Sequence, residues 1–84
     1  MFKIIYAKSV SRDIKKIAPY NLSKIKNGVE ELHNFPNISN IKRLTKHPIA
    51  DFRLRIGNYR VLFDVNWYRK EIYILKIGHR REVY

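Results

Sequence analysis

A Gly57-Asn58 pair between two β-patterned stretches constrains the fold more than any other feature of the sequence. Apolar residues and arginines alternate over residues 52–56, and residues 59–65 are rich in β-forming side chains. Glycine accepts a positive φ, so a two-residue Gly-Asn connection predicts a tight β-hairpin. Successive side chains of a strand point to opposite faces, so Arg53 and Arg55 should share the face that turns away from the core.

The first half of the chain predicts a strand over residues 2–7 followed by two helices. The first helix is capped by Ser9 or Ser11 and ends at Pro19, and the second is capped by Asn21 and ends at Pro36. Both carry aliphatic stripes at helical spacing, which we interpret as packing against a sheet. The stripes consist of Val10, Ile14, Ile17 and Ala18 in the first helix and of Leu22, Ile25, Val29 and Leu32 in the second.

The second half predicts strands. Prolines and asparagines in residues 36–50 indicate a loop with a short strand near residues 42–45. Further on, residues 66–70 predict a looser turn and residues 71–77 a last strand, which ends at Gly78. The order β-α-α-β-β-β predicts a single α+β domain over residues 1–84. We expect a twisted, mainly antiparallel sheet with a two-helix hairpin on one face, and a first strand that pairs inside or beside the three-strand meander.

The net positive charge of the chain indicates what kind of partner it binds. The chain has 18 Lys and Arg against 7 Asp and Glu, a formal net charge of +11 over 84 residues. Such an excess favours a polyanionic partner, which could be nucleic acid, an acidic protein or an anionic membrane surface, while a merely soluble basic protein is the alternative. No apolar run approaches the roughly 20 residues that span a bilayer, and the start is too short for a signal peptide, so we expect a cytoplasmic protein without a membrane partner.

Several kinds of chemistry are disfavoured by the residues present. The chain has no cysteine, which removes thiolate nucleophiles and thiolate metal sites. Only Glu30 and Glu31 are adjacent carboxylates, and neighbours on a helix point in different directions. The three histidines show no ligand spacing and are expected at the surface. We therefore predict no metal site and no cofactor.

Arginines from three separate stretches should meet at one end of one sheet face. Arg60 follows the Gly-Asn turn on the strand antiparallel to the one that carries Arg53 and Arg55. Arg80 and Arg81 follow the last strand, whose end should lie beside Arg60. Arginines without a nearby carboxylate in sequence favour an anionic ligand such as phosphate, with solvated surface charge as the alternative. This convergence indicates anion binding without specifying a reaction.

RNA cleavage is possible without a metal. The 2′-OH is an internal nucleophile already placed beside the scissile phosphorus, and arginines can neutralise the charge that develops on the phosphate. Arginine carries protons poorly because its pKa exceeds about 12, so Tyr84, His79 or a group of the RNA or of another assembly must move the protons. Nearby positive charge would stabilise the phenolate of Tyr84, although an ordinary terminal residue is the alternative.

Two strings of residues resemble a known family. Residues 51–65, with Arg-x-Gly-x-Tyr-Arg-Val, and residues 74–84, with Gly-His-Arg-Arg-Glu-Val-Tyr, are similar to the RelE/ParE superfamily of toxins from bacterial and archaeal toxin–antitoxin modules, and most similar to its RelE branch. The strand and two helices before them also match, so the resemblance covers essentially the whole chain. It implies a microbial-ribonuclease-like fold and a toxin that cuts mRNA in the ribosomal A site, without a metal, through 2′-OH attack.

The resemblance also implies roles for individual residues. Arg53 and Arg55 would bind and activate at the scissile phosphate, and Arg60 would stabilise the transition state. Arg80 would assist the leaving group. Tyr84 would act in base catalysis or stack on an mRNA base.

Further basic residues are expected to contact the nucleic acid: Arg43, Lys46, His79 and Arg81. The implied partners are the ribosome and mRNA, a cognate antitoxin with an acidic or amphipathic segment, and DNA only indirectly through a toxin–antitoxin complex. Two alternatives stay open at this point. One is a ParE-like toxin that inhibits DNA gyrase and cleaves nothing, since one fold can support both activities. The other is a basic RNA-binding module without activity.

Overall fold

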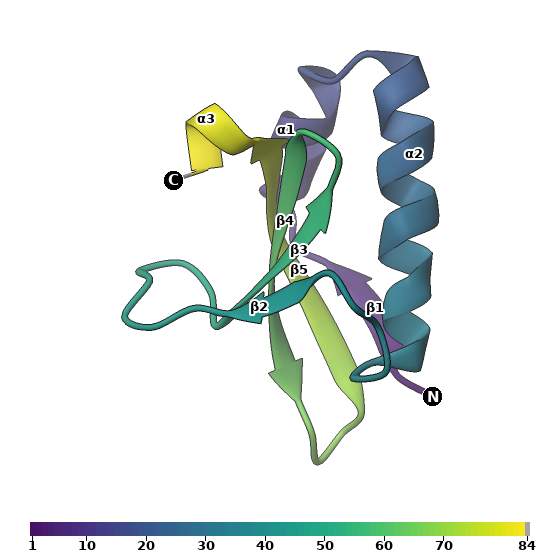
Figure 1. Ribbon diagram of the computed structural model, residues 1–84, viewed down its shortest axis with the longest axis vertical. Helices are drawn as coiled ribbons and strands as arrows, with labels where there is room; N and C mark the ends of the chain where they lie inside the picture. The colour runs from purple at the N-terminus through teal and green to yellow at the C-terminus, as the bar shows by residue number, and fades with distance from the viewer. Residues whose placement is uncertain (84) are drawn as a thin grey trace.

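The computed structural model describes residues 1–83, which form one five-stranded sheet with the strand order β1-β5-β4-β3-β2 and a set of short helices (Figure 1). The strands are β1 (Lys3–Tyr6), β2 (Ile41–Arg43), β3 (Phe52–Ile56), β4 (Tyr59–Asn66) and β5 (Glu71–His79). The helices are α1 (Val10–Lys15), α2 (Pro19–Glu30), the 3₁₀ turn η1 (Glu31–Asn34) and α3 (Arg80–Val83). The α+β class predicted from the sequence is confirmed.

The predicted hairpin and meander are both present. β3 ends at Ile56 and β4 begins at Tyr59, and Gly57 between them has a φ of 57°. β3, β4 and β5 pair antiparallel in sequence order. β1 lies beside this meander, as expected, and pairs parallel with β5 at the edge of the sheet. The short strand expected near residues 42–45 is β2, which pairs antiparallel with β3.

The boundary between the two helices differs from the prediction. α1 already ends at Lys15, and Pro19 occupies the first turn of α2 instead of ending the helix before it. Ala18, not Asn21, is the N-cap residue. The physical reason is that a proline lacks only an N–H that has no helical partner at this position, and its fixed φ already suits a helix.

α1 also completes an edge of the sheet. Past the end of β1, the Asp13 carboxylate accepts a hydrogen bond from the backbone N–H of Ile77 at 3.0 Å. The Ser9 hydroxyl donates to the carbonyl oxygen of Leu75 at 3.2 Å. These side chains satisfy β5 backbone groups that would otherwise lie on an open edge.

The main core lies between the sheet and the helices. Both predicted aliphatic stripes contribute to it, and Ile25, Val29 and Leu32 are fully or almost fully buried. The Phe35 ring makes edge contacts with the rings of Phe2, Phe52 and Phe63 at centroid distances of 5.5–5.9 Å. Within the described residues, none of the helices could cross a membrane.

The sequence did not predict α3. We expected Gly78 to end the last strand, but β5 continues to His79 and the chain then turns into α3. Figure 1 shows α3 and the loop between β2 and β3 on the side of the sheet opposite α2. Val83 from α3, Ala50 from the loop and Leu62 from β4 form a second, small apolar cluster there.

Candidate nucleic-acid interface

Three arginines lie on the sheet face that turns away from α2, which we call the arginine face: Arg53, Arg55 and Arg60. Arg55 and Arg60 are directly opposite each other on β3 and β4. Directly opposed side chains in an antiparallel pair share a face and are close neighbours, and two like charges in that position destabilise the sheet. The pair therefore stores repulsion that a bound anion would relieve.

Arg60 is held in place by the turn. Only 8% of its surface is exposed, and its Nη1 donates to the carbonyl oxygens of Gly57 and Tyr59, both at 2.9 Å. Its Nε is buried and finds no acceptor among the described residues. Within the described residues its hydrogen-bond partners are carbonyl dipoles, which fix the position of the guanidinium, and a fixed cation of this kind stabilises developing negative charge.

The C-terminal stretch returns to the same end of the sheet. Gly78 lies opposite Arg60 in the β4–β5 pair, and the backbone N–H of Arg80 donates to the carbonyl oxygen of Asn58 at 2.8 Å. The backbones that carry Arg55, Arg60 and Arg80 thus meet around the Gly57-Asn58 turn, as the sequence predicted. Arg80 and Arg81 are both exposed on α3.

Close contact at Gly78 lets α3 fold back over the arginine face. A Cβ at this position would lie 2.9 Å from Cγ2 of Val83, which is too close for a side chain. Val83 is buried against Leu62 in the second apolar cluster. Tyr84 follows directly in the sequence, and its predicted role lies outside the described residues.

Lys42 is a further basic residue on the arginine face, and the sequence alone predicted no role for it. Lys42 is exposed on β2 and lies directly opposite Arg53. Its place depends on the register between β2 and β3. The sequence indicated a strand near this position but gave no register for it.

Two predicted nucleic-acid contacts lie on the other face of the sheet. Arg43 is opposite Phe52, and its guanidinium carbon is 5.9 Å from the centre of that ring. His79 is opposite Tyr59, with 5.7 Å between the ring centres. The structure therefore does not bring Arg43 and His79 together with the arginine face. Lys46 is exposed in the loop before β3.

Among the described residues, no carboxylate forms an ion pair at the turn end of the arginine face. The ion pairs among residues 1–83 join His33 to Glu30, Arg69 to Glu71 and Lys76 to Asp13. None of these involves Arg55, Arg60 or Arg80. The same residues contain no cluster of three or more His, Cys, Asp or Glu side chains that could hold a metal ion.

The far end of this face holds acidic and phenolic groups that have partners of their own. Asp64, on β4, accepts a hydrogen bond from the backbone N–H of Asp51 at 2.7 Å. Tyr73, opposite Asp64 on β5, donates its hydroxyl to Glu71, and this hydrogen bond raises the pKa of the phenol. A phenol with a raised pKa stays protonated and is a poor general base.

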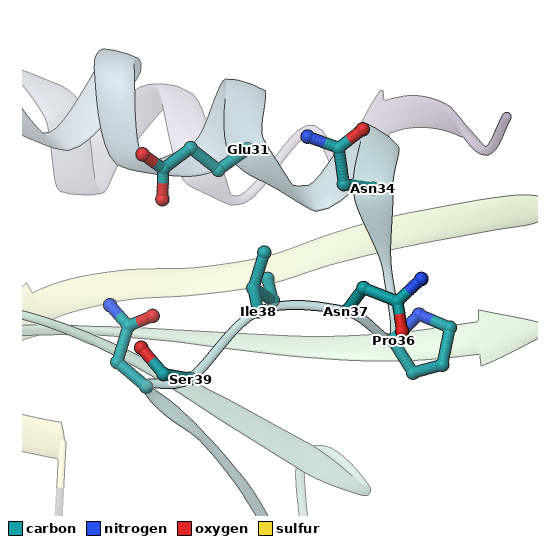
Figure 2. A pocket seen from close by; sticks show the side chains of 7 residues that line it. Glu31, Asn34, Pro36, Asn37, Ile38 and Ser39 are labelled. Carbon is teal, nitrogen blue, oxygen red and sulfur yellow. The ribbon is translucent and has the colours of Figure 1, made fainter.

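A pocket of about 630 Å³ lies between η1 and the loop that follows it (Figure 2). Amide, hydroxyl and carboxylate groups line most of it, and no cation does. The lining consists of Glu31, Asn34, Pro36, Asn37, Ile38, Ser39 and Asn40. Asn40 bonds to the backbone of Arg55, with its Nδ2 donating to the Arg55 carbonyl oxygen. Asn40 thus links this pocket to the strand that carries Arg55, but none of the predicted site residues lines the pocket.

The fold and the arginine face define a small, strongly basic α+β protein that carries three arginines on one sheet face. Comparison with known proteins identifies its family. The family profile described as the ParE toxin of the type II toxin-antitoxin system parDE matches residues 4–84. The chain belongs to this ParE/RelE family, and it is a toxin of a type II toxin–antitoxin system.

Its relatives support the RelE branch. RelE1 of Methanocaldococcus jannaschii is 37% identical over 86 residues, covering 99% of this chain and 94% of the relative. Toxin RelE3 of the same organism is 28% identical over 85 residues, covering 98% and 94%. Among solved structures, the archaeal RelE–RelB complex from Pyrococcus horikoshii matches with a TM-score of 0.76 and 25% identity, covering 96% of this chain and 97% of that one.

Proposed function

We propose that this toxin is a metal-independent endoribonuclease that cleaves mRNA on the ribosome by 2′-OH attack and so inhibits translation. The observation that carries the proposal is the Arg55–Arg60 pair, which lies on one face and has no carboxylate ion-pair partner among residues 1–83. Its RelE-named relatives and its membership of the toxin family support the same function.

The reaction is a transesterification at phosphorus. The 2′-oxygen forms a bond to phosphorus as it loses its proton, and the bond from phosphorus to the 5′-oxygen breaks as that oxygen gains one. The products are a 2′,3′-cyclic phosphate and a new 5′-hydroxyl end. RNA itself supplies the nucleophile in a near-attack position, so the protein needs to position the linkage, stabilise charge and move protons.

The arginines differ in exposure and in how firmly they are held, so we assign them different tasks in this reaction. Arg53 and Arg55, on a strand open to the solvent side of the sheet, are the proposed phosphate-binding residues. Arg60 is fixed by the Gly57 and Tyr59 carbonyls, so we assign it to the phosphate oxygens in the transition state, where a preorganised donor is most effective. Arg80 is the proposed leaving-group residue, and Tyr84 the base or stacking residue.

A reconstituted translation reaction with purified ribosomes tests the assignment of Arg60. We expect Arg60→Ala to lower the rate of mRNA cleavage by about 10²–10³-fold, the usual effect of losing one preorganised donor. Arg69→Ala is the matched control, because Arg69 is an exposed arginine at the opposite end of the sheet and pairs with Glu71.

Arg60 is buried, so a loss of folding must be separated from a loss of chemistry. Thermal unfolding of Arg60→Ala by circular dichroism provides that check, and the exposed Arg55→Ala provides a second variant with little risk to the fold. Folded Arg55→Ala and Arg60→Ala proteins that cleave mRNA as fast as the Arg69→Ala control would contradict the proposal.

A second candidate function comes from the family description, which names ParE toxins. The sequence-based alternative was a toxin that inhibits DNA gyrase, and the shared fold permits both activities. Expressing cells separate the two: breaks in DNA without cuts in mRNA would identify the ParE-like activity. The RelE names of both relatives favour cleavage of mRNA.

The proposed protein partner is an antitoxin, since the matching structure from Pyrococcus horikoshii is a complex of RelE with RelB. An almost wholly apolar groove of about 270 Å³ between α1, α2 and the sheet is a place for an apolar antitoxin segment. Tyr6 lines this groove, and burial together with the nearby Glu30 raises the pKa of its phenol, so it stays neutral. An acidic segment of the same antitoxin would cover the arginine face.

A further inference from the structure

A second pocket lies on the other side of the Gly57-Asn58 turn from Arg60, and we call it the turn pocket. It has a volume of about 380 Å³ and forms where the beginning of α2 meets the β3–β4 turn and the end of β5, at the end of the molecule where Figure 1 shows these three segments. Its lining consists of Asn21, Lys24, Ile25, Ile56, Gly57, Asn58, Tyr59 and His79.

The turn pocket combines the surfaces that a nucleobase requires. Ile25 and Ile56 give it an apolar floor, and the rings of Tyr59 and His79 stand beside each other at an interplanar angle of 76°. The Asn21 amide nitrogen bonds to the Tyr59 hydroxyl at 3.3 Å, which orients that amide toward the ring. Sites for small organic ligands are mostly apolar with a few convergent polar groups, and aromatic rings add stacking partners for bases.

Charge distinguishes the turn pocket from its neighbour. Tyr59 and His79 also line an adjacent pocket of about 240 Å³, but that pocket contains the carboxylates of Asp13 and Glu82 together with a single lysine, Lys16. The lining of the turn pocket includes Lys24 and no carboxylate. In the adjacent pocket the two carboxylates outnumber Lys16, so of the two pockets the turn pocket is the one that favours a phosphate.

The turn also joins the pocket to the arginine face. Gly57 and Tyr59, whose carbonyl oxygens hold the Arg60 guanidinium, both line the turn pocket. The hairpin end between the two surfaces is open to solvent, because Gly57 and Asn58 are both exposed. A strand of RNA held on the arginine face can therefore pass over this end and continue into the pocket.

We propose that the turn pocket binds one nucleotide of the RNA strand that lies next to the linkage on the arginine face. The base rests on Ile25 and Ile56 beside the Tyr59 ring, the amides of Asn21 and Asn58 contact its edge, and Lys24 binds the phosphate. The choice of RNA as ligand rests on the proposed nuclease function. That the pocket binds a nucleotide at all is inferred from its own lining and does not depend on the nuclease function.

Binding of single nucleotides to the isolated protein tests this inference without ribosomes or cleavage. We expect 5′-AMP, 5′-GMP, 5′-CMP or 5′-UMP to shift the backbone NMR signals of Asn21, Asn58 and Tyr59, and inorganic phosphate alone to bind more weakly. Lys24→Glu should weaken nucleotide binding by about tenfold, the loss of one charge-assisted contact.

Lys26→Glu is the matched control, since Lys26 lies on the same helix, is also exposed, and lines the apolar groove instead. Equal weakening by Lys24→Glu and Lys26→Glu, or shifts confined to the arginine face, would overturn the inference. The two proposals fail separately: a toxin that cleaves mRNA but binds no nucleotide here loses only the pocket, and one that binds nucleotides here but cleaves nothing loses only the nuclease function.

Discussion

At the scale of single residues, Arg60 is a buried cation of the arginine face whose guanidinium is held by the β3–β4 turn. Burying a charge is costly unless polar groups surround it, and the two turn carbonyls supply only part of what a guanidinium can bond. The remaining buried Nε has no acceptor among the described residues. Arg60 therefore retains capacity to bind an anion, while backbone carbonyls of the turn set its position.

Lys42 gives a test at the same scale, because only the structure identifies it. If RNA crosses the arginine face, Lys42 opposite Arg53 contributes one phosphate contact. Lys42→Ala should lower the slope of log affinity against log salt by about 0.7 for a single-stranded RNA, the share of one phosphate contact. Lys3→Ala is the control, since Lys3 lies opposite Glu71 at the other end of the sheet. Unchanged slopes for Lys42→Ala, measured by fluorescence anisotropy, would remove Lys42 from the interface.

At the scale of elements, α3 couples the end of β5 to the arginine face. The coupling depends on Gly78, whose missing side chain leaves room for Val83. It also depends on a bulge in β5, because Leu62 pairs with Lys76 while Phe63 pairs with Ile74, which leaves Leu75 as an extra residue. Leu75 packs with Leu62 and Val83 in the small cluster that anchors α3.

Gly78→Ala tests this coupling. An added Cβ must displace Val83, and overpacking of this kind typically costs about 1–3 kcal/mol. We expect a lower free energy of unfolding in urea, together with slower mRNA cleavage because Arg80 moves with α3. Combining Gly78→Ala with Val83→Ala should restore part of the cleavage rate. A Gly78→Ala protein with wild-type stability and activity would show that the close contact has no role.

The sequence predicted most of the local elements, but it did not predict the register between strands or the contacts between distant residues. The alternation over residues 52–56 and the Gly57-Asn58 turn correctly predicted the hairpin and the shared face of Arg53 and Arg55, since both depend on neighbours along the chain. The positions of Lys42, Arg43 and His79 depend on strand register. α3 depends on a contact between Gly78 and Val83 that forms only after the sheet does. Such tertiary contacts leave no periodic signal.

At the scale of the whole molecule, charge and apolar surface are divided between two sides. The apolar groove lies on the helix side and the arginine face lies on the other, so an antitoxin that covers both, as we propose, would have to wrap the molecule. A net charge of +11 favours an acidic segment in that chain. This division predicts that binding of antitoxin and cleavage of RNA can be separated by mutation.

Tyr6→Glu tests that separation, because Tyr6 is an exposed aromatic residue at the rim of the apolar groove. A charge there should weaken binding of the cognate antitoxin by at least about tenfold, since an apolar contact would be replaced by a buried carboxylate. Cleavage of mRNA by the free toxin should stay unchanged. Isothermal titration calorimetry measures the first and reconstituted translation the second, and full affinity in Tyr6→Glu would place the antitoxin elsewhere.

Mapping of mRNA 5′ ends after brief expression in cells tests the proposed function most directly. The wild-type protein should create new 5′-hydroxyl ends inside translated reading frames, and the Arg60→Ala protein at equal abundance should create almost none. New ends at equal frequency with both proteins would show that the arginine face is not where RNA is cut, and an absence of new ends alongside broken DNA would show that this toxin does not act on RNA.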